Sequence, residues 1–317
     1  MTSDRALVRP KIGLFLPQWD GQLFGPPEPP APRWSELQSM ALAAEDAGLD
    51  SLWLVDDLLF EGDPPRGFWE GWSLLAAVAA VTRRAEIGHL VTANTFRNPA
   101  LLAKMADTVD EISGGRLILG LGAGGDEHEH RAFGFPWERR VARFEEALQI
   151  IIPLLREGRV DFQGEFYSIR ECELRPRGPR TTGPPILIGA LANAPRMLRL
   201  TAQYADMSHG FFAFGRSTPD QVPPLRDALD SACLRVGRDP ATLARTAAVR
   251  VELDGPIGHM NAADEPIRGS VEDIADIFWK FADEGISHLM LALSPETNAA
   301  IEHIGQVIQQ MDRGRAA

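Results

Sequence analysis

The sequence predicts a single (β/α)8 TIM barrel, an α/β fold, over residues 1–317. Short apolar runs alternate with amphipathic stretches eight times, which is typical of βα units around a parallel sheet. EDAGLDSLWL (45–54) and ADEGISHLML (282–291) repeat the order helix, glycine, strand. No shift in composition marks a second domain. An open doubly wound sheet is the alternative, but eight regular units without a long break favour the barrel.

The first half of the chain contributes four of these units. Apolar runs predict strands over 11–17, 51–55, 86–92 and 116–122. Apolar residues at helical spacing predict helices over 34–47, 70–82, 98–113 and 141–155. Asn98 and Pro99 are a favourable helix start, because the asparagine can cap and the proline suits the first turn. Pro153 is expected to kink or end the fourth helix.

The second half contributes the other four. The predicted strands are 185–190, 204–210, 245–253 and 288–293, and the predicted helices are 194–203, 218–236, 270–284 and 296–312. Residues 160–169 (VDFQGEFYSI) predict a small inserted β-hairpin that turns near Gly164. The long loop 254–269 precedes the last βα unit, and its Gly, Pro and Asp content favours a lid.

Composition excludes several classes of protein. The two cysteines, Cys172 and Cys233, argue against a disulfide framework and favour the cytoplasm. The first eleven residues contain no apolar run of the kind a signal peptide needs. No stretch of 18 apolar residues predicts a membrane span. The net charge of −12 argues against nucleic-acid binding, which usually needs a basic patch.

The stretch LILGLGAGGDEHEH (117–130) contains two competing signals. Its G-x-G-x-x-G resembles a dinucleotide fingerprint, but it follows the fourth strand and not the first, and no acid-ended strand comes about 20 residues later. His128 and His130 suggest a metal, but ligands on a helix usually lie three or four residues apart, so we expect no metal. The third interpretation is a loop at the active face of a barrel, where glycines let the backbone approach a flat ligand.

Several stretches together are similar to one family. The run VTANTFRNPALLAKMADTVDEISGGRLILGLGAGG (91–125) resembles the luciferase-like monooxygenases, and specifically the branch that uses the deazaflavin coenzyme F420. AGLDSLWLVDD (47–57), FGFPWERRVARFEEAL (133–148) and GALANAPRMLRLTAQYAD (189–206) extend the resemblance over nearly the whole chain.

The resemblance implies where a cofactor lies. The ring covers the carboxyl ends of the strands, backed by the third strand, where a non-proline cis peptide often occurs. The loop after the fourth strand borders the ring or its tail. Backbone N–H groups after the fifth strand bind the phosphate at a helix start. The implied cofactor-binding residues are Asp56, Leu90, Val91, Ala93, Gly122, Gly124, Gly125, Gly189, Ala190, Leu191, Ala192 and Asn193.

The chain departs from the F420 branch where that branch handles protons. Asp57 stands where the branch usually has histidine, and Asp126 stands where relatives carry other residues. A carboxyl with a raised pKa can serve as acid or base, so Asp57 is a candidate catalytic residue; a helix-capping or hydrogen-bonding acid is the alternative. His128 is the second catalytic candidate.

Aromatic residues and histidines fall on other predicted active-face positions. Trp19, Phe68, Trp69, His209 and Phe211, with Phe24, are candidates for a substrate pocket, although aromatic core packing is the alternative. His89 lies within the third strand and can face either way.

Three functions are consistent with the sequence. The first is an F420-dependent oxidoreductase that transfers a hydride between deazaflavin C5 and a small organic substrate. The second is an FMN-dependent monooxygenase, and the third is a non-catalytic barrel that binds a flavin or small molecule. F420 has a long anionic tail, so a basic rim near the phosphate loop, to which Arg196 and Arg199 could contribute, would favour it. The resemblance also implies a homodimer.

Overall fold

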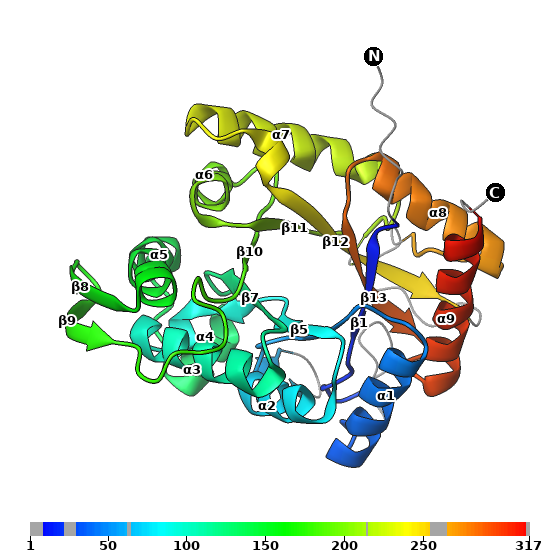
Figure 1. Cartoon of the computed structure of the whole chain (residues 1–317), viewed down its shortest axis with the longest axis horizontal. Helices are drawn as coiled ribbons and strands as arrows, with labels where there is room; N and C mark the ends of the chain where they lie inside the picture. The colour runs from blue at the N-terminus through cyan, green and yellow to red at the C-terminus, as the bar shows by residue number, and fades with distance from the viewer. Residues whose placement is uncertain (1–8, 22–29, 62–64, 214, 254–264, 315–317) are drawn as a thin grey trace.

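Eight parallel strands form a closed barrel in the part of the chain that the structure describes (Figure 1). The structure is a computed structural model and describes residues 9–21, 30–61, 65–213, 215–253 and 265–314. The strands are β1 (Lys11–Phe15), β2 (Ser51–Leu54), β5 (Glu86–His89), β7 (Leu117–Gly122), β10 (Ile186–Gly189), β11 (Met207–Phe211), β12 (Ala244–Glu252) and β13 (His288–Ser294). The barrel closes because β10 pairs with both β7 and β11. The predicted barrel is therefore confirmed.

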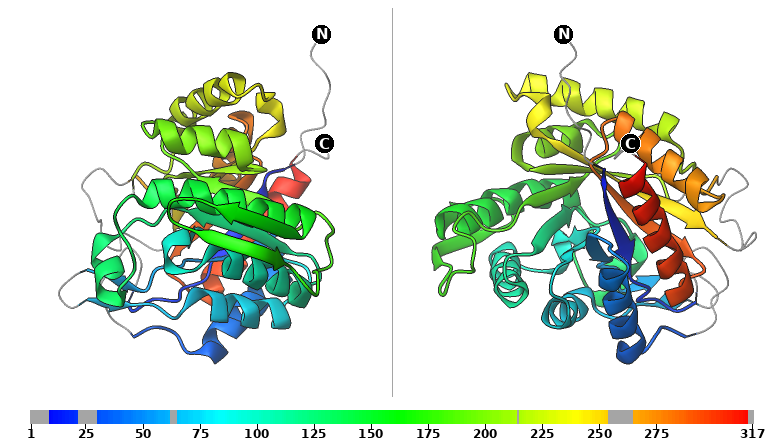
Figure 2. Two further views of the ribbon diagram at one scale, coloured as in Figure 1. Left: turned by 90° about the vertical axis from the view of Figure 1, so that its left-hand side faces the viewer. Right: turned by 45° about the vertical axis from the view of Figure 1, so that its right-hand side comes forward.

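Each barrel strand is followed by a helix that lies on the outside (Figures 1 and 2). These helices are α1 (Trp34–Asp46), α2 (Gly71–Val81), α3 (Pro99–Ser113), α5 (Arg140–Glu157), α6 (Pro195–Tyr204), α7 (Val222–Arg235), α8 (Val271–Asp283) and α9 (Asn298–Arg313). Asn98 caps α3 as expected, because its side chain accepts from the N–H of Ala100. Of the two effects expected of Pro153, a kink or an end, the helix does not end there, since α5 continues to Glu157.

Smaller elements are inserted between these units. The predicted hairpin is confirmed as β8 (Arg159–Gln163) and β9 (Ser168–Glu173), which lie beside α5 (Figure 1). The others are β3 (Leu59–Phe60), β4 (Arg66–Gly67), β6 (Thr92–Ala93), α4 (Glu127–Phe133) and the short 3-10 turns η1 (Asn94–Phe96), η2 (Pro219–Gln221) and η3 (Pro240–Thr242). Of the predicted lid 254–269, residues 254–264 lie outside the described residues.

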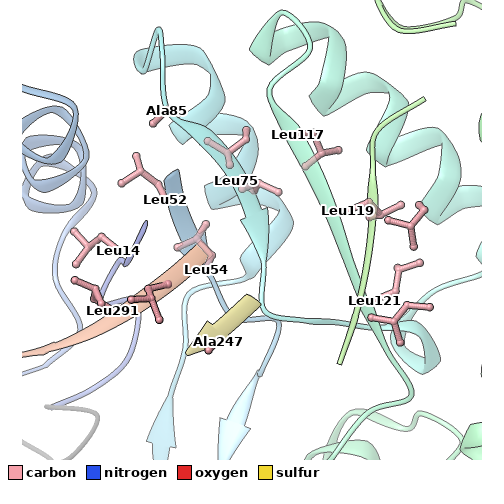
Figure 3. Packing of buried hydrophobic residues seen from close by; sticks show 14 of the residues in the cluster. Leu14, Leu52, Leu54, Leu75, Ala85, Leu117, Leu119, Leu121, Ala247 and Leu291 are labelled. Carbon is pink, nitrogen blue, oxygen red and sulfur yellow. The ribbon is translucent and has the colours of Figure 1, made fainter. Parts of the chain in front are cut away.

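Alternation along the strands builds two cores. On β7, Leu117, Leu119 and Leu121 point toward the helices and belong to the large core shown in Figure 3. Ile118, between them, belongs to a smaller second core, as does Trp53 of β2. This period of two is what a barrel requires, because alternate side chains face its interior.

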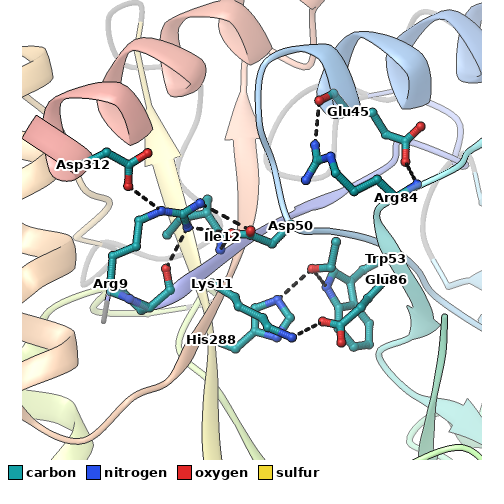
Figure 4. A network of polar contacts seen from close by, with 12 residues as sticks. Arg9, Lys11, Ile12, Glu45, Asp50, Trp53, Arg84, Glu86, His288 and Asp312 are labelled. Atoms are coloured by element: carbon teal, nitrogen blue, oxygen red, sulfur yellow. Dashed lines mark hydrogen bonds and ion pairs between the residues drawn. The ribbon is translucent and has the colours of Figure 1, made fainter. Parts of the chain in front are cut away.

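Polar contacts tie the amino ends of the strands together (Figure 4). Arg9 bonds Asp50 before β2 at 2.6 Å and Asp312 of α9 at 2.9 Å. Lys11 of β1 pairs with Glu86 of β5 at 2.7 Å. This end of the barrel is therefore held by surface ion pairs, while the opposite end is open to a cavity. No helix among the described residues has the length and apolar character to cross a membrane.

Candidate active-site cavity

A cavity of about 560 Å³ opens at the carboxyl ends of the barrel strands. Its volume falls within the range of small-molecule sites, roughly 300–1,000 Å³. It is lined by Asp56, Asp57, Leu90, Val91, Ala93, Gly122, Ala123, Gly124, Gly125, Glu129, Arg140, Val141, Gly189, Ala190, Leu191, Ala194, Met197, His209 and Phe211. Most of the residues that the sequence assigned to a cofactor are therefore brought together in one place.

The third strand forms one wall of this cavity and is interrupted. The predicted continuous strand 86–92 is divided into β5 and β6 around a cis peptide between Leu90 and Val91. This confirms the non-proline cis peptide that the resemblance implied. β6 then pairs with β7.

Two glycines of β7 leave room for that interrupted segment. A β-carbon on Gly120 would lie 1.9 Å from the carbonyl oxygen of His89, and one on Gly122 would lie 2.6 Å from the Val91 side chain. The two glycines of the G-x-G pattern therefore allow the third strand to pack closely against β7. At Gly120, the space is needed for this packing and not for a cofactor.

Asp56 holds the cavity wall that the third strand forms. Its carboxylate accepts two hydrogen bonds from Arg97, at 2.5 and 2.7 Å, and one from the Ala93 N–H at 2.9 Å. Arg97 also bonds Glu70 at 3.0 Å, and Glu70 caps α2. Burial raises the pKa of Asp56 to about 6, against the lowering effect of Arg97. The Asp56–Arg97 pair thus fixes the position of the β6 backbone.

Asp57, the next residue, lines the cavity and is only partly exposed. Burial, together with the nearby carboxylates of Asp56 and Asp126, raises the pKa of its carboxyl to about 6. Within the described residues, no ion pair joins Asp57 to an Arg or Lys side chain. Asp57 therefore has the environment of a proton-handling carboxyl.

Glu129 lines the same cavity and was not expected from the sequence. It lies in the first turn of α4, is only 2% exposed, and accepts the Leu58 N–H at 2.9 Å. Burial raises the pKa of Glu129 to about 7, and Asp57 and Asp126 contribute to the rise. No sequence motif distinguishes it from the other acids of the stretch 126–129.

The two histidines of α4 lie away from the cavity lining. His128 is not among the lining residues, and its Nδ1 lies 4.0 Å from the Glu61 carboxylate. His130 is fully buried: Nδ1 contacts the Asp126 carbonyl at 2.5 Å, and Nε2 contacts the Thr95 hydroxyl at 2.7 Å. His128, the second catalytic candidate, is therefore not part of the cavity lining. Among the described residues, no group of three or more His, Cys, Asp or Glu is placed to hold a metal ion.

The loop between β10 and α6 forms another wall. Gly189, Ala190 and Leu191 line the cavity, while Ala192 and Asn193 lie in the same loop but not in the lining. No side chain caps α6 at Ala194, so backbone N–H groups at its start are available to an anion.

Arg140 is the one cationic side chain among the described lining residues. Its Nε donates to the Gly124 carbonyl at 3.1 Å, and its guanidinium lies 4.1 Å from the Trp137 ring centre. Arg196 and Arg199, the residues that could contribute to a basic rim, both bond Glu145, at 2.7 and 2.6 Å. The single negative charge of Glu145 offsets one of the two positive charges. Arg140 had not been singled out in the sequence.

His209 and Phe211 of β11 line the cavity as expected. The Thr246 hydroxyl donates to the Ser208 carbonyl at 3.1 Å and contacts His209 Nδ1 at 2.8 Å. Both contacts are satisfied when Nδ1 carries the proton and donates to Thr246, which leaves Nε2 as an acceptor. Burial lowers the pKa of His209 to about 3, so the ring is neutral.

The other aromatic candidates pack outside the cavity lining. Trp19 is 2% exposed and packs against Phe68, with ring centres 6.2 Å apart. Trp69 is half exposed and donates to the Pro32 carbonyl. The core-packing alternative therefore fits Trp19 and Phe68. Phe24 lies outside the described residues. His89 is buried against Trp72 and is also absent from the lining.

Comparison with known proteins assigns the class. The family model for luciferase-like monooxygenases matches residues 11–255, and the chain belongs to this family. It is 30% identical over 233 residues to a 5,10-methylenetetrahydromethanopterin reductase of Archaeoglobus fulgidus, covering 73% of this chain and 65% of that protein. It is 32% identical over 257 residues to the pyrimidine monooxygenase RutA of Methylorubrum extorquens, covering 77% of this chain and 66% of that protein. The chain thus spans about two thirds of the length of these relatives.

Solved structures agree on the fold. An F420-dependent secondary alcohol dehydrogenase superposes with a TM-score of 0.77 at 18% identity, covering 96% of this chain and 99% of that one. A riboflavin lyase superposes with a TM-score of 0.80 at 15% identity, covering 98% and 93%. These two relatives are named a reductase and a monooxygenase, and this chain belongs to the same luciferase-like family.

Proposed function

We propose that the protein is an oxidoreductase that uses coenzyme F420 and acts on a small organic substrate. The observation that carries the proposal is the position of Asp57 in the cavity, where a carboxyl without a cationic partner among the described residues can handle a proton although the F420 branch has a histidine there. It lines the same cavity as the Leu90–Ala93 wall, on which a flat ring would lie. The resemblance of residues 91–125 to the F420 branch supports the same conclusion.

The residues present fit such a cofactor. Leu90, Val91 and Ala93 offer an apolar face for the ring. The backbone of Gly189 to Leu191 and the Arg140 guanidinium would hold a phosphate, because an anion is favoured at a helix start and beside an arginine. When bound, the deazaflavin supplies a carbon that accepts or donates hydride.

The chain's own residues would position the reactants and handle a proton. Asp57 would hold or release the proton at its carboxyl, and its pKa of about 6 lies near working pH, where proton transfer is efficient. A protonated Asp57 also avoids repulsion with an anionic reduced ring. The apolar side chains of Val91 and Phe211 would limit water in the cavity.

A second candidate is an FMN-dependent monooxygenase. It is favoured by the 32% identity to RutA, and FMN would use the same ring wall and phosphate loop. The anionic tail of F420 would need cations beyond those that FMN needs. Because Glu145 engages Arg196 and Arg199, Arg140 is left as the residue for that purpose inside the cavity.

Titration of the purified protein with F420 and with FMN, followed by fluorescence, tests the proposal. Binding of F420 with little or no binding of FMN is the expected result. The reverse preference would establish the monooxygenase alternative. Binding of neither cofactor would contradict both and leave a barrel that binds another small molecule.

A further inference from the structure

His209 is a buried histidine that lines the cavity from β11 and is 4% exposed. The residue beside it in the sheet is Gly189 on β10 and Thr246 on β12. Paired residues of neighbouring parallel strands point to the same face of a sheet, so these three positions share the face that lines the cavity. His209 therefore lies between a hydroxyl on one side and a position without a side chain on the other.

The contacts of Thr246 decide which nitrogen of His209 carries the proton. The Thr246 hydroxyl donates to the Ser208 carbonyl at 3.1 Å and lies 2.8 Å from His209 Nδ1. Because a hydroxyl has only one hydrogen to donate, it must accept from Nδ1. Nδ1 therefore carries the proton, and Nε2 of the neutral ring has a lone pair to offer. Burial lowers the pKa of His209 to about 3, which keeps the ring neutral at working pH.

Nε2 of His209 has no hydrogen-bond partner within the part of the chain that the structure describes. The two nitrogens of an imidazole ring face different directions, so Nε2 points away from Thr246 and β12. On the β10 side, Gly189 leaves open space, because a β-carbon there would meet nothing within 4 Å. A buried acceptor without a partner is unfavourable, and this open space is where a partner can bind.

The chemistry of Nε2 restricts what that partner is. A lone pair binds a hydroxyl or N–H group, whereas a carbonyl or ether oxygen at the same place offers it no hydrogen. Apolar side chains such as Leu191, Met197 and Phe211 line the same cavity. The surroundings of His209 therefore suit a small organic molecule with an apolar body and a hydroxyl or N–H group.

We propose that His209 recognises the ligand of this cavity through Nε2, which accepts a hydrogen bond from a hydroxyl or N–H group, and that Thr246 is the positioning residue that holds the required tautomer. β11 lies four strands from β2 in either direction around the barrel. The donor group of the ligand is therefore bound on the side of the cavity opposite Asp57, which follows β2. The identity of the ligand as the substrate of an oxidoreductase rests on the proposed function.

The first test is the ¹⁵N NMR spectrum of the full-length protein labelled at histidine, without a cofactor and at neutral pH. The signals of His209 are assigned by their loss in His209→Leu. We expect Nδ1 to have the chemical shift of a protonated nitrogen and Nε2 that of an unprotonated one. Thr246→Val should lose this strict preference, and Thr246→Ser, which keeps the hydroxyl, should retain it. A protonated Nε2 in wild type, or an unchanged tautomer in Thr246→Val, would overturn the proposal.

The second test compares cyclohexanol with cyclohexanone, which are similar in size although only the alcohol can donate a hydrogen bond. Without a cofactor neither compound reacts. We expect cyclohexanol to move the Nε2 signal of His209 and to bind about fivefold more tightly than cyclohexanone, which is the scale of one neutral hydrogen bond. His130 is the internal control, because both of its nitrogens are engaged outside the cavity lining and its signals should not move.

Variants assign the preference for the alcohol to His209. Calorimetry should show that His209→Leu binds the two compounds with similar Kd values. Thr246→Val should weaken the preference while Thr246→Ser keeps it, and this pair carries the test if His209→Leu fails to fold. A preference for cyclohexanol that persists in folded His209→Leu would place the acceptor elsewhere and overturn the proposal.

The donor group can belong to the substrate or to the cofactor, since F420 and FMN both carry N–H and hydroxyl groups. Movement of the Nε2 signal on addition of either cofactor alone would assign the donor to the cofactor, and movement with cyclohexanol alone would assign it to the substrate. An unmoved signal with all three probes would overturn the proposal. A protein that fails to bind F420 but shows the effect of cyclohexanol would lose the proposed function and keep the role of His209.

Discussion

Arg97 holds Asp56 through two hydrogen bonds of 2.5 and 2.7 Å, from its two terminal nitrogens to the two carboxylate oxygens. The Asp56 side chain is 1% exposed, and the same carboxylate accepts the N–H of Ala93. Asp56 therefore supports the cavity wall, while Asp57 has no such structural partner and is the candidate for proton transfer.

Loss of Arg97 should destabilise the fold. Arg97→Met leaves the Asp56 carboxylate buried without its partner, which costs about 3 kcal/mol of unfolding free energy. Urea unfolding measures this loss of unfolding free energy. The exposed Arg83→Met should cost less than about 0.5 kcal/mol, and the double variant Asp56→Asn/Arg97→Met should recover part of the loss. Equal effects of Arg97→Met and Arg83→Met would contradict a supporting role for the pair.

His209 should make the protein less stable in acid. Its pKa is about 3 when folded and about 6.5 when unfolded, so the unfolded state binds the proton more tightly. Its contribution is fully present above pH 6.5 and falls by about 1.4 kcal/mol per pH unit as the pH drops toward 3. We expect His209→Asn to reduce the loss of unfolding free energy between pH 7 and pH 5. An unchanged pH dependence in this variant would mean that His209 is not held neutral.

Gly120 should tolerate no β-carbon. Gly120→Ala places that carbon 1.9 Å from the His89 carbonyl, so we expect a loss of about 3 kcal/mol or more, or failure to fold. Gly125→Ala meets nothing within 4 Å and should change the unfolding free energy by less than about 1 kcal/mol. Similar melting temperatures for the two variants would refute the close packing of β7 against the interrupted third strand.

Arg140 should contribute to binding of an anionic cofactor. Arg140→Met removes the cation and keeps the length of the side chain, and we expect a Kd at least about tenfold higher, as for one hydrogen bond to a charged group. Arg196→Met is the control, because Glu145 already engages Arg196. Its Kd should change little. A larger effect at Arg196 would place the anion outside the cavity.

Periodicity accounts for most of what the sequence predicts. The apolar run at 116–122 and the helical spacing along 98–113 predict elements that the structure contains. The apolar pattern did not predict the division of the third strand, because residues 86–92 read as one continuous run; only the family resemblance implied an irregularity there, the cis peptide. Pro153 did not end its helix.

The sequence predicted the cavity-lining residues that lie at strand ends. It missed the lining residue whose position depends on how a helix is oriented. Asp57, Leu90 and Gly189 follow or end strands, and so they reach the cavity. His128 and Glu129 differ by one residue on α4, about 100° around a helix, and that rotation turns Glu129 inward and His128 away from the lining. Spacing alone cannot fix the orientation of a seven-residue helix.

The most direct measurement is F420 binding to wild type and to Gly189→Trp. A β-carbon on Gly189 meets nothing within 4 Å, so a large side chain there should fill the cavity without disturbing the fold. We predict that wild type binds F420 in preference to FMN and that Gly189→Trp, with an unchanged circular dichroism spectrum, binds neither. Undiminished F420 binding to the folded variant, or a wild type that prefers FMN, would contradict the account.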